Sequence, residues 1–257
     1  MVAAPLTSTE LLDLCLAEDF LQQGEREVDL LQARRRRDLY WVLGLLGCRG
    51  IRVVPSDLEA VWKGRPGRFR PEHREYVWIR GLRRAIDRIE RAGEKGLPPV
   101  REDLFDLFRL VEGREEESLP ASLLRREEPW DAPGGSVHPE PELLDLCLAE
   151  FRPERGYGEG GRRYRALHPV HRAAVVCRSV LHLSPFPDLN AWIAILAASQ
   201  HLLATGYPPF LPQVADRPTL RTIRKARRED AFLEWFADLV LVGYRCLARG
   251  AGPTAWD

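Results

Sequence analysis

The sequence predicts an all-α fold, and three observations support this prediction. Apolar residues recur at three- and four-residue intervals along most of the chain, which is the spacing of one helix face. Gly- and Pro-rich stretches such as GRPGRFRP separate these segments, as loops do. Apolar residues make up 45% of the 257 and charged residues 30%, which is typical of a globular chain that buries a core and not of a disordered one.

The first 55 residues are expected to form an N-terminal helical extension. Ser8 or Thr9 can cap a first helix, because either hydroxyl can accept a hydrogen bond from a backbone N–H of the first turn. A second helix is predicted from about 28 to 46. Its run Arg34–Arg37 is typical of a solvated helix face, and the alternative is a contact with an anion.

The remainder, residues 56–257, is expected to form the main domain. A short helix should follow the Ser56-Asp57 cap, and a long amphipathic helix is predicted at about 72–92. Further helices are predicted at about 101–110, 140–151, 169–183, 190–205, 217–228 and 231–247.

Two segments lack a helical pattern. Residues from about 113 to 139, which include EEPWDAPGGSVHP, predict an irregular loop or a short hairpin. The segment GYGEGGRR predicts an exposed connector because of its glycine content. The nine residues ELLDLCLAE occur twice, at 10–18 and 142–150, and the similarity does not extend beyond them, so a domain duplication is not indicated.

Composition argues against two classes of partner. Lys and Arg together number 38, as do Asp and Glu, so the chain lacks the basic excess that a nucleic-acid-coating protein uses to meet phosphate. No stretch approaches the roughly 20 apolar residues that a membrane span requires.

The five scattered cysteines form no CxxC pair, which favours free thiols in a reducing compartment, and we expect a cytoplasmic location.

Several segments follow one another in an order that resembles the Fic family. HPVHRAAVVC occupies residues 168–177, LSPFPDLNAWIAI residues 183–195 and LLATGYPPF residues 202–210. They are similar, in turn, to the HPxxRAAxxH helix, the catalytic loop HPFxDGNGRxxR and the GYPP step of Fic proteins. WDAPGGSVHPEPELLDLCLAEF resembles the Gly-rich hairpin and helix that cover the Fic active site. The resemblance implies an all-α Fic-like domain with a small β-hairpin flap.

The resemblance also implies a chemistry, which is transfer of AMP to a hydroxyl group. In that family a histidine is the general base, an acidic residue holds magnesium, and Asn and glycine amides at a helix N-terminus bind phosphates. Ser184 stands at the histidine position and cannot serve as a base near neutral pH. Asp188 stands at the metal position and Asn190 at the phosphate position, so these two are the candidate residues for ATP with magnesium.

Most of the remaining catalytic signature is absent. Leu189 and Ala191 occupy the two glycine positions, which adds bulk where a phosphate should approach the backbone. Trp192 and Ile195 replace the two arginines that bind pyrophosphate, and Cys177 replaces the second histidine of the preceding helix. Loss of a general base costs about 10²–10⁴ in rate, and loss of a phosphate-binding Arg about 10³–10⁵.

Many Fic proteins carry an inhibitory helix of the form [ST]xxxE[GN], whose Glu pairs with the second Arg of the catalytic loop. The matching stretch here is LLGCRGIRVV. If Gly50 is aligned with the family's Gly, Leu45 stands at the Ser/Thr position and Arg49 at the Glu position. The inhibitory pair is therefore expected to be absent together with the Arg that it would engage.

Four residues have two interpretations each. His182 could become the base in a shifted loop, or it could pack or face solvent at a helix end. Asp188 could bind magnesium, or it could cap the helix that follows. Trp192 could stack on a base or a partner, or it could be a buried aromatic. Trp130, in the flap, could contact a partner segment, or it could pack in the core.

We therefore expect a catalytically degenerate Fic-like protein, a pseudoenzyme that acts by binding a protein partner at the flap groove or a nucleotide. The alternative is a nucleotidyl or phosphoryl transferase with a remodelled active-site loop. Substitution of Asp188 or Asn190 should change the activity of a transferase, whereas substitution of Trp130 should change the function of an interaction protein. The sequence leaves open the partner, the oligomeric state and the role of residues 1–50.

Overall fold

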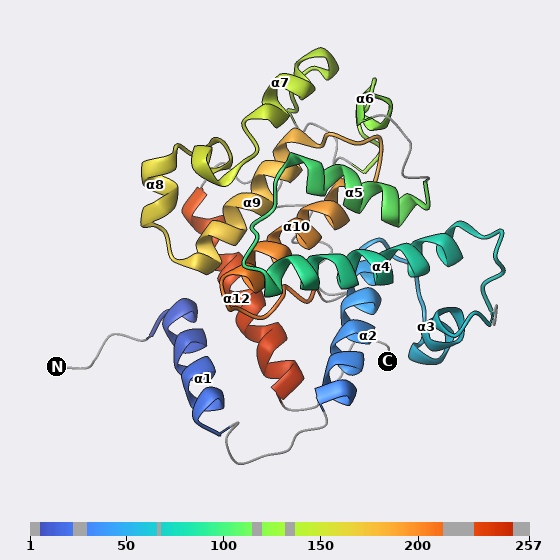
Figure 1. The fold of residues 1–257 in the computed structure, drawn as a ribbon, viewed down its shortest axis with the longest axis horizontal. Helices are drawn as coiled ribbons and strands as arrows, with labels where there is room; N and C mark the ends of the chain where they lie inside the picture. The colour runs from blue at the N-terminus through green and yellow to red at the C-terminus, as the bar shows by residue number, and fades with distance from the viewer. Residues whose placement is uncertain are drawn as a thin grey trace.

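The computed structural model describes residues 6–22, 30–65, 68–114, 120–131, 137–212 and 229–248. These residues form helices and connecting segments and contain no strand, which confirms the all-α prediction (Figure 1). The predicted helix at 217–228 lies outside the described residues. The α-helices are α1 (Ser8–Gln22), α2 (Leu30–Cys48), α3 (Pro55–Trp62), α4 (Arg74–Glu94), α5 (Arg101–Glu112), α6 (Pro120–Leu123), α7 (Leu144–Ala149), α8 (Gly161–Ala166), α9 (Pro169–Leu183), α10 (Asn190–Ala204) and α12 (Glu229–Ala248).

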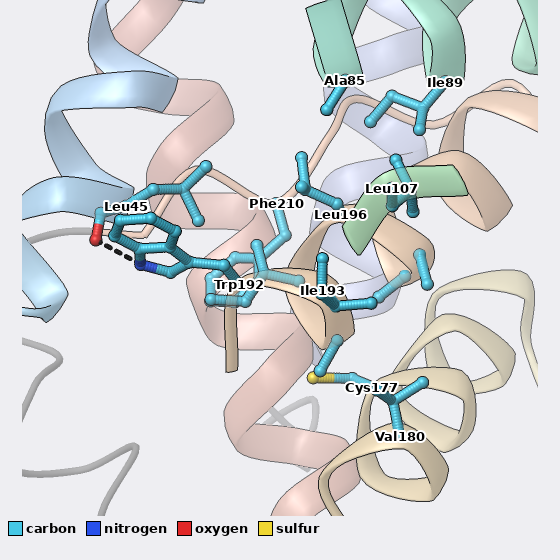
Figure 2. Packing of buried hydrophobic residues seen from close by; sticks show 14 of the residues in the cluster. Leu45, Ala85, Ile89, Leu107, Cys177, Val180, Trp192, Ile193, Leu196 and Phe210 are labelled. Atoms are coloured by element: carbon cyan, nitrogen blue, oxygen red, sulfur yellow. Dashed lines mark hydrogen bonds between the residues drawn. The ribbon is translucent and has the colours of Figure 1, made fainter. Parts of the chain in front are cut away.

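The helix α10 lies at the centre of the molecule and packs against α9, α4 and α5. All residues of the stretch 192–202 are buried, so this helix has no solvated face. Figure 2 shows Ile193 and Leu196 of α10 among side chains from α4, α5 and α9, including Ala85, Leu107 and Val180. This burial fixes the N-terminal end of α10, where the predicted site residues lie.

The helix α2 is held to α3 and α4 by its arginines. Arg34 pairs with the buried Glu90, and Arg35 pairs with Glu59 at 3.0 Å. Arg37 contacts Asp38, whose side chain is fully buried and whose pKa is raised by that burial. The basic run therefore binds carboxylates of the protein itself and braces the helix against its neighbours.

The N-terminal helices share one hydrophobic cluster with the rest of the chain. Leu12 of α1 and Leu45 of α2 belong to the same cluster as the α10 residues. The helix α1 packs against α12, and Asp13 accepts a hydrogen bond from the Tyr207 hydroxyl at 2.8 Å. The division at residue 55 stays a prediction. None of the helices in the described ranges is long and apolar enough to cross a membrane.

The two copies of the segment ELLDLCLAE bury the same side of the segment against the core. Its third residue is buried in both copies, as Leu12 and Leu144, and its fifth is exposed in both, as Leu14 and Leu146. The first copy lies within α1, whereas the second forms the 3₁₀ helix η1 (Pro141–Leu143) and α7. The shared pattern is that of an amphipathic helix docked on a core.

The predicted β-hairpin flap is not seen among the described residues. Its two arms, residues 125–131 and 137–140, are irregular, and the connection 132–136 lies outside the described part of the chain. The first arm pairs with a neighbouring loop instead, because Arg125 N–H donates to the carbonyl of Pro185 and Trp130 N–H to that of Pro187, each at 2.9 Å. Pro129 and Pro139, which have no N–H to donate, also disfavour a ladder between the arms.

The glycine-rich connector is exposed only in part, at Gly158, Gly160, Arg162 and Arg163. Residues 153–158 form a 3₁₀ helix, η2 (Pro153–Gly158), and the next segment forms α8. Tyr157 is buried with φ at 54°, and its hydroxyl donates to the carbonyl of Pro99 at 2.9 Å. Its ring packs against Phe151 and Tyr164, and this aromatic cluster holds the connector on the core.

Candidate functional site

The candidate site is the loop of residues 184–189 between α9 and α10, together with the N-terminus of α10. Ser184 ends α9 and Leu189 precedes α10, both with left-handed backbone conformations, at φ 39° and 66°. The Asn190 side chain closes the loop, since its Oδ1 accepts from Phe186 N–H at 2.9 Å and its Nδ2 donates to the Phe186 carbonyl at 2.8 Å. Phe186 is fully buried and stacks on Phe108.

A bidentate ion pair joins this loop to the end of α2. Arg49 donates from Nη1 to Oδ1 of Asp188 at 2.8 Å and from Nη2 to Oδ2 at 2.5 Å. The Asp188 side chain is only 7% exposed, and Oδ1 also accepts from Leu189 N–H at 2.8 Å. Two parallel charge-assisted bonds to a buried carboxylate are a strong, directional contact.

Aromatic rings enclose this ion pair. The Arg49 guanidinium lies 4.8 Å from the Trp78 ring centre and 5.6 Å from that of Trp192. Arg74 covers Trp78 at 4.7 Å and approaches Asp188 at 3.7 Å. Arg74 is itself paired with Glu112 at 3.1 Å, so the two cations of the cluster face two carboxylates.

A carboxylate from the flap occupies the N-terminus of α10. Asp131 Oδ2 accepts from Ala191 N–H at 3.1 Å, and its Oδ1 accepts from Asn190 Nδ2 at 2.9 Å. The N-cap residue Leu189 makes no side-chain capping bond, and Asp131 supplies the carboxylate that accepts from a backbone N–H of the first turn. Asp188 is therefore not the helix cap that the sequence offered as an alternative.

Arg125 holds both arms of the flap against the loop. Its guanidinium is buried and donates to the carbonyls of Ser184 at 2.8 Å, of Glu127 at 3.2 Å and of Pro139. Burial lowers the pKa of Arg125, and the nearby Glu128 and Glu140 oppose that shift. No sequence signal singled out Arg125 or Asp131, because each contacts a residue about sixty positions away in the sequence.

The residue at the general-base position is not available to a substrate. Ser184 is fully buried, and its hydroxyl donates to the carbonyl of Leu181 at 2.8 Å. His182 has an exposed ring at the end of α9, and its backbone carbonyl, rather than its ring, contacts His138 at 2.9 Å. Partial desolvation lowers the pKa of His182, and His138 and Arg178 lower it further.

The residues at the arginine and second histidine positions belong to the core. Trp192 is 2% exposed and donates from Nε1 to the Leu45 carbonyl at 2.7 Å, as Figure 2 shows. Ile195 and Cys177 are also buried. The buried-aromatic interpretation of Trp192 is confirmed. Trp130, in contrast, is 80% exposed, so its core-packing interpretation is wrong.

The arrangement does not suit a magnesium ion. Magnesium binds in proteins through carboxylates that keep free oxygen positions, together with substrate phosphates and water. Asp188 Oδ1 already accepts two hydrogen bonds, and Oδ2 lies between the guanidinium groups of Arg49 and Arg74. Among the residues that the structure describes, no group of three His, Cys, Asp or Glu side chains is placed to hold a metal.

Comparison with known proteins identifies the fold. No protein-family model matches the sequence, and no curated protein matches it significantly. Among solved structures, the chain is similar to a Fic domain containing signaling protein from Bacteroides thetaiotaomicron, with a TM-score of 0.75 and 13% identity over 95% of this chain and 97% of the other. It is also similar to Fic-1 from C. elegans, with a TM-score of 0.70 and 16% identity over 95% of this chain and 71% of the other. A third similar structure is a Fic family protein from Desulfovibrio desulfuricans G20, with a TM-score of 0.64 and 14% identity over 96% of this chain and 76% of the other.

Proposed function

We propose that this chain, which has the Fic fold, is a catalytically degenerate member of that fold that binds a protein partner and transfers no nucleotide. One observation carries the proposal. Two side chains of the protein itself occupy the places where a phosphate and a metal ion would bind in this loop. Asp131 lies at the N-terminus of α10, and Arg49 is bonded to Asp188. An anion and a cation from outside would each have to displace a group that is already bonded.

The anion position is closed to phosphate for an electrostatic reason. A phosphate bound at a helix N-terminus needs the free backbone N–H groups of the first turn. Ala191 N–H already donates to the Asp131 carboxylate, which also receives the Asn190 amide. A phosphate approaching this point would meet a negative charge within a few ångströms, and at about 4 Å this repulsion costs on the order of 4 kcal/mol near a protein surface.

The metal position, Asp188, is already bound by the positively charged guanidinium of Arg49, which repels a magnesium ion. The Arg49 guanidinium lies on both oxygens of Asp188, and Arg74 stands 3.7 Å from Oδ2. A divalent cation could reach the carboxylate only after Arg49 had left. Because Asp188 is buried, the ion would have to replace both hydrogen bonds from Arg49 and remain beside the positive charge of Arg74.

Binding of a protein partner is supported by the flap. Trp130 is 80% exposed and Val137 84% exposed, and they stand on the two arms that Arg125 fixes to the loop. Large apolar side chains held in solvent by an anchored backbone are typical of a protein interaction site. We also propose a cytoplasmic location, with residues 1–55 as an extension of the Fic-like domain of 56–257; among the described residues, Cys15 and Cys147 are free thiols.

A labelling experiment tests the proposal. The full chain is incubated with magnesium and ATP labelled at the α-phosphate, alone and with added protein extract, beside the Asp188→Ala variant as background. We expect no protein to gain label above that background. Label that depends on the chain and disappears in Asp188→Ala would favour the alternative, a transferase with a remodelled loop, and would overturn the proposal.

A further inference from the structure

We infer that the partner presents a basic segment carrying at least one large apolar side chain, and that it binds the flap surface. This name denotes the exposed side chains of residues 126–130 and 137–146. The inference rests on the proposed function and names the chemistry of the partner that the function requires. The occupant is a segment of another protein with Arg or Lys on either side of an aromatic or aliphatic residue.

The flap surface carries four of the nine large hydrophobic side chains that the structure shows exposed. Besides Trp130 and Val137, Leu143 is 49% exposed and Leu146 is 70% exposed. These four lie within seventeen residues of sequence, whereas the five other large hydrophobic side chains that the structure shows exposed are spread between positions 6 and 242. A concentration of this kind favours a binding surface over scattered exposure, which is ordinary on proteins.

The same segment is strongly acidic. Residues 125–150 contain seven Asp and Glu against two Arg, a net charge of −5, in a chain whose net charge is zero. One of the seven, Asp131, is bonded at the N-terminus of α10. Two others are paired, Asp145 with Arg101 at 3.2 Å and Glu150 with Arg155 at 3.5 Å.

The remaining four acids have no ion pair to any other residue that the structure describes, and all four are exposed; they are Glu127, Glu128, Glu140 and Glu142. They come from both arms of the flap. Glu128 and Glu140 each follow a residue whose carbonyl accepts from the Arg125 guanidinium, Glu127 on the first arm and Pro139 on the second, so both arms carry an acid near one guanidinium. Complementary charge on a partner would therefore be basic.

The surface is also held in place before any partner arrives. Arg125 bonds to the carbonyls of Glu127 and Pro139, one on each arm, and to Ser184 of the loop. Trp130 N–H donates to Pro187. A preorganised backbone lowers the entropy cost of binding, so an exposed Trp can act as an anchor while the exposed acids of the two arms select for basic residues.

Selection from a random peptide library displayed on phage tests the inference. The folded full chain is the target, and the Trp130→Ala variant is used for counter-selection. We expect the surviving peptides to be enriched in Arg and Lys together with Trp, Phe or Leu. Trp130 is 80% exposed, so its truncation leaves the core intact, and thermal unfolding of the variant checks this.

An enriched peptide is then synthesised and its affinity measured by fluorescence anisotropy. We expect Trp130→Ala to weaken binding at least about 30-fold, and Glu128→Gln and Glu140→Gln to weaken it about two- to fivefold each. Added salt should also weaken it. The matched controls are Leu97→Ala, an exposed apolar residue elsewhere, and Glu72→Gln, an exposed acid elsewhere; both should leave the affinity unchanged.

The inference would be overturned if no peptide survived counter-selection, or if the surviving peptides were acidic or uncharged. It would also be overturned if substitution of Trp130, Glu128 and Glu140 left the peptide affinity unchanged. These results are separate from a failure of the proposed function, which shows as AMP transfer that depends on Asp188. A chain that transfers no AMP and selects only acidic peptides would keep the proposed function and lose the inferred partner chemistry.

Discussion

The Arg49 guanidinium and the Asp188 carboxylate form two parallel hydrogen bonds, at 2.8 and 2.5 Å, between the end of α2 and the loop before α10. The sequence resemblance to Fic proteins implied that Arg49 stands at the position of an inhibitory Glu and Asp188 at that of a metal-binding residue. The structure shows a cation just after α2 bound to a loop acid, whereas the resemblance implied a helix acid bound to a loop arginine.

The first prediction concerns this ion pair. Arg49→Ala should lower the free energy of unfolding by about 3 kcal/mol, because it removes both hydrogen bonds to the buried Asp188 and leaves only the more distant Arg74 beside it. Arg49→Lys should recover only part of the loss, since an ammonium group cannot form the two parallel bonds. Urea denaturation followed by circular dichroism measures both.

Arg35→Ala is the matched control, because Arg35 is half exposed and its pair with Glu59 should contribute at most about 0.5 kcal/mol. Equal losses for Arg49→Ala and Arg35→Ala would show that the Asp188 pair has no special weight in the fold.

The second prediction concerns the carboxylate at the N-terminus of α10. Asp131→Ala should destabilise the protein by about 1–2 kcal/mol, because it removes the acceptor of Ala191 N–H and of the Asn190 amide. Asp131→Asn, which keeps one acceptor oxygen, should lose less. The same denaturation measurement applies, and an Asp131→Ala variant as stable as the parent would contradict the capping role.

The third prediction concerns restoration of the missing base. Ser184→His should not produce AMP transfer, because Trp192 and Ile195 still replace the two arginines and Asp131 still occupies the helix end. The larger side chain in a fully buried position should also cost about 1–3 kcal/mol of stability. Incorporation of α-phosphate label by Ser184→His, above that of the parent chain, would show that only the base was missing.

The fourth prediction concerns pH. His201 is 4% exposed, and burial, with a smaller contribution from Arg172, lowers its pKa to about 4. The unfolded chain binds a proton near pH 6.5 and the folded one does not until about pH 4, so stability should fall as the pH drops through this window. The full loss is about 3 kcal/mol.

His201→Gln should remove most of this pH dependence between pH 6.5 and 5, whereas His73→Gln, at an exposed position, should not. Denaturation midpoints measured across that range distinguish the two variants. A slope that persists in His201→Gln would assign the effect to other groups.

The helices of the core could be predicted from sequence because their signals are local. The α9 prediction agrees with the structure at both ends, and α10 agrees to within one residue, since apolar spacing and the flanking Pro and Asn mark their limits. The identities at Ser184, Trp192 and Ile195 are the basis for predicting loss of the usual chemistry, which stays a prediction, and the structure shows all three residues buried.

The contacts that close the site could not be predicted in this way. Asp131 lies 59 residues from Asn190, and Arg49 lies 139 residues from Asp188, and no local pattern reports such pairs. The flap was predicted as a hairpin through the family resemblance, but its first arm forms backbone hydrogen bonds to the loop carbonyls of Pro185 and Pro187. Tyr157 was missed because the glycines around it suggested an exposed connector.

Arg49 and Asp131 are proposed to occupy the positions that a nucleotide and its metal ion would take, and isothermal titration of the full protein with ATP and magnesium tests whether they do. We expect no binding heat at millimolar ATP, for the parent chain and for Asp188→Ala alike. Saturable binding by the parent chain that disappears in Asp188→Ala would overturn the proposal, because it would mean that nucleotide displaces Arg49 and Asp131 from the loop.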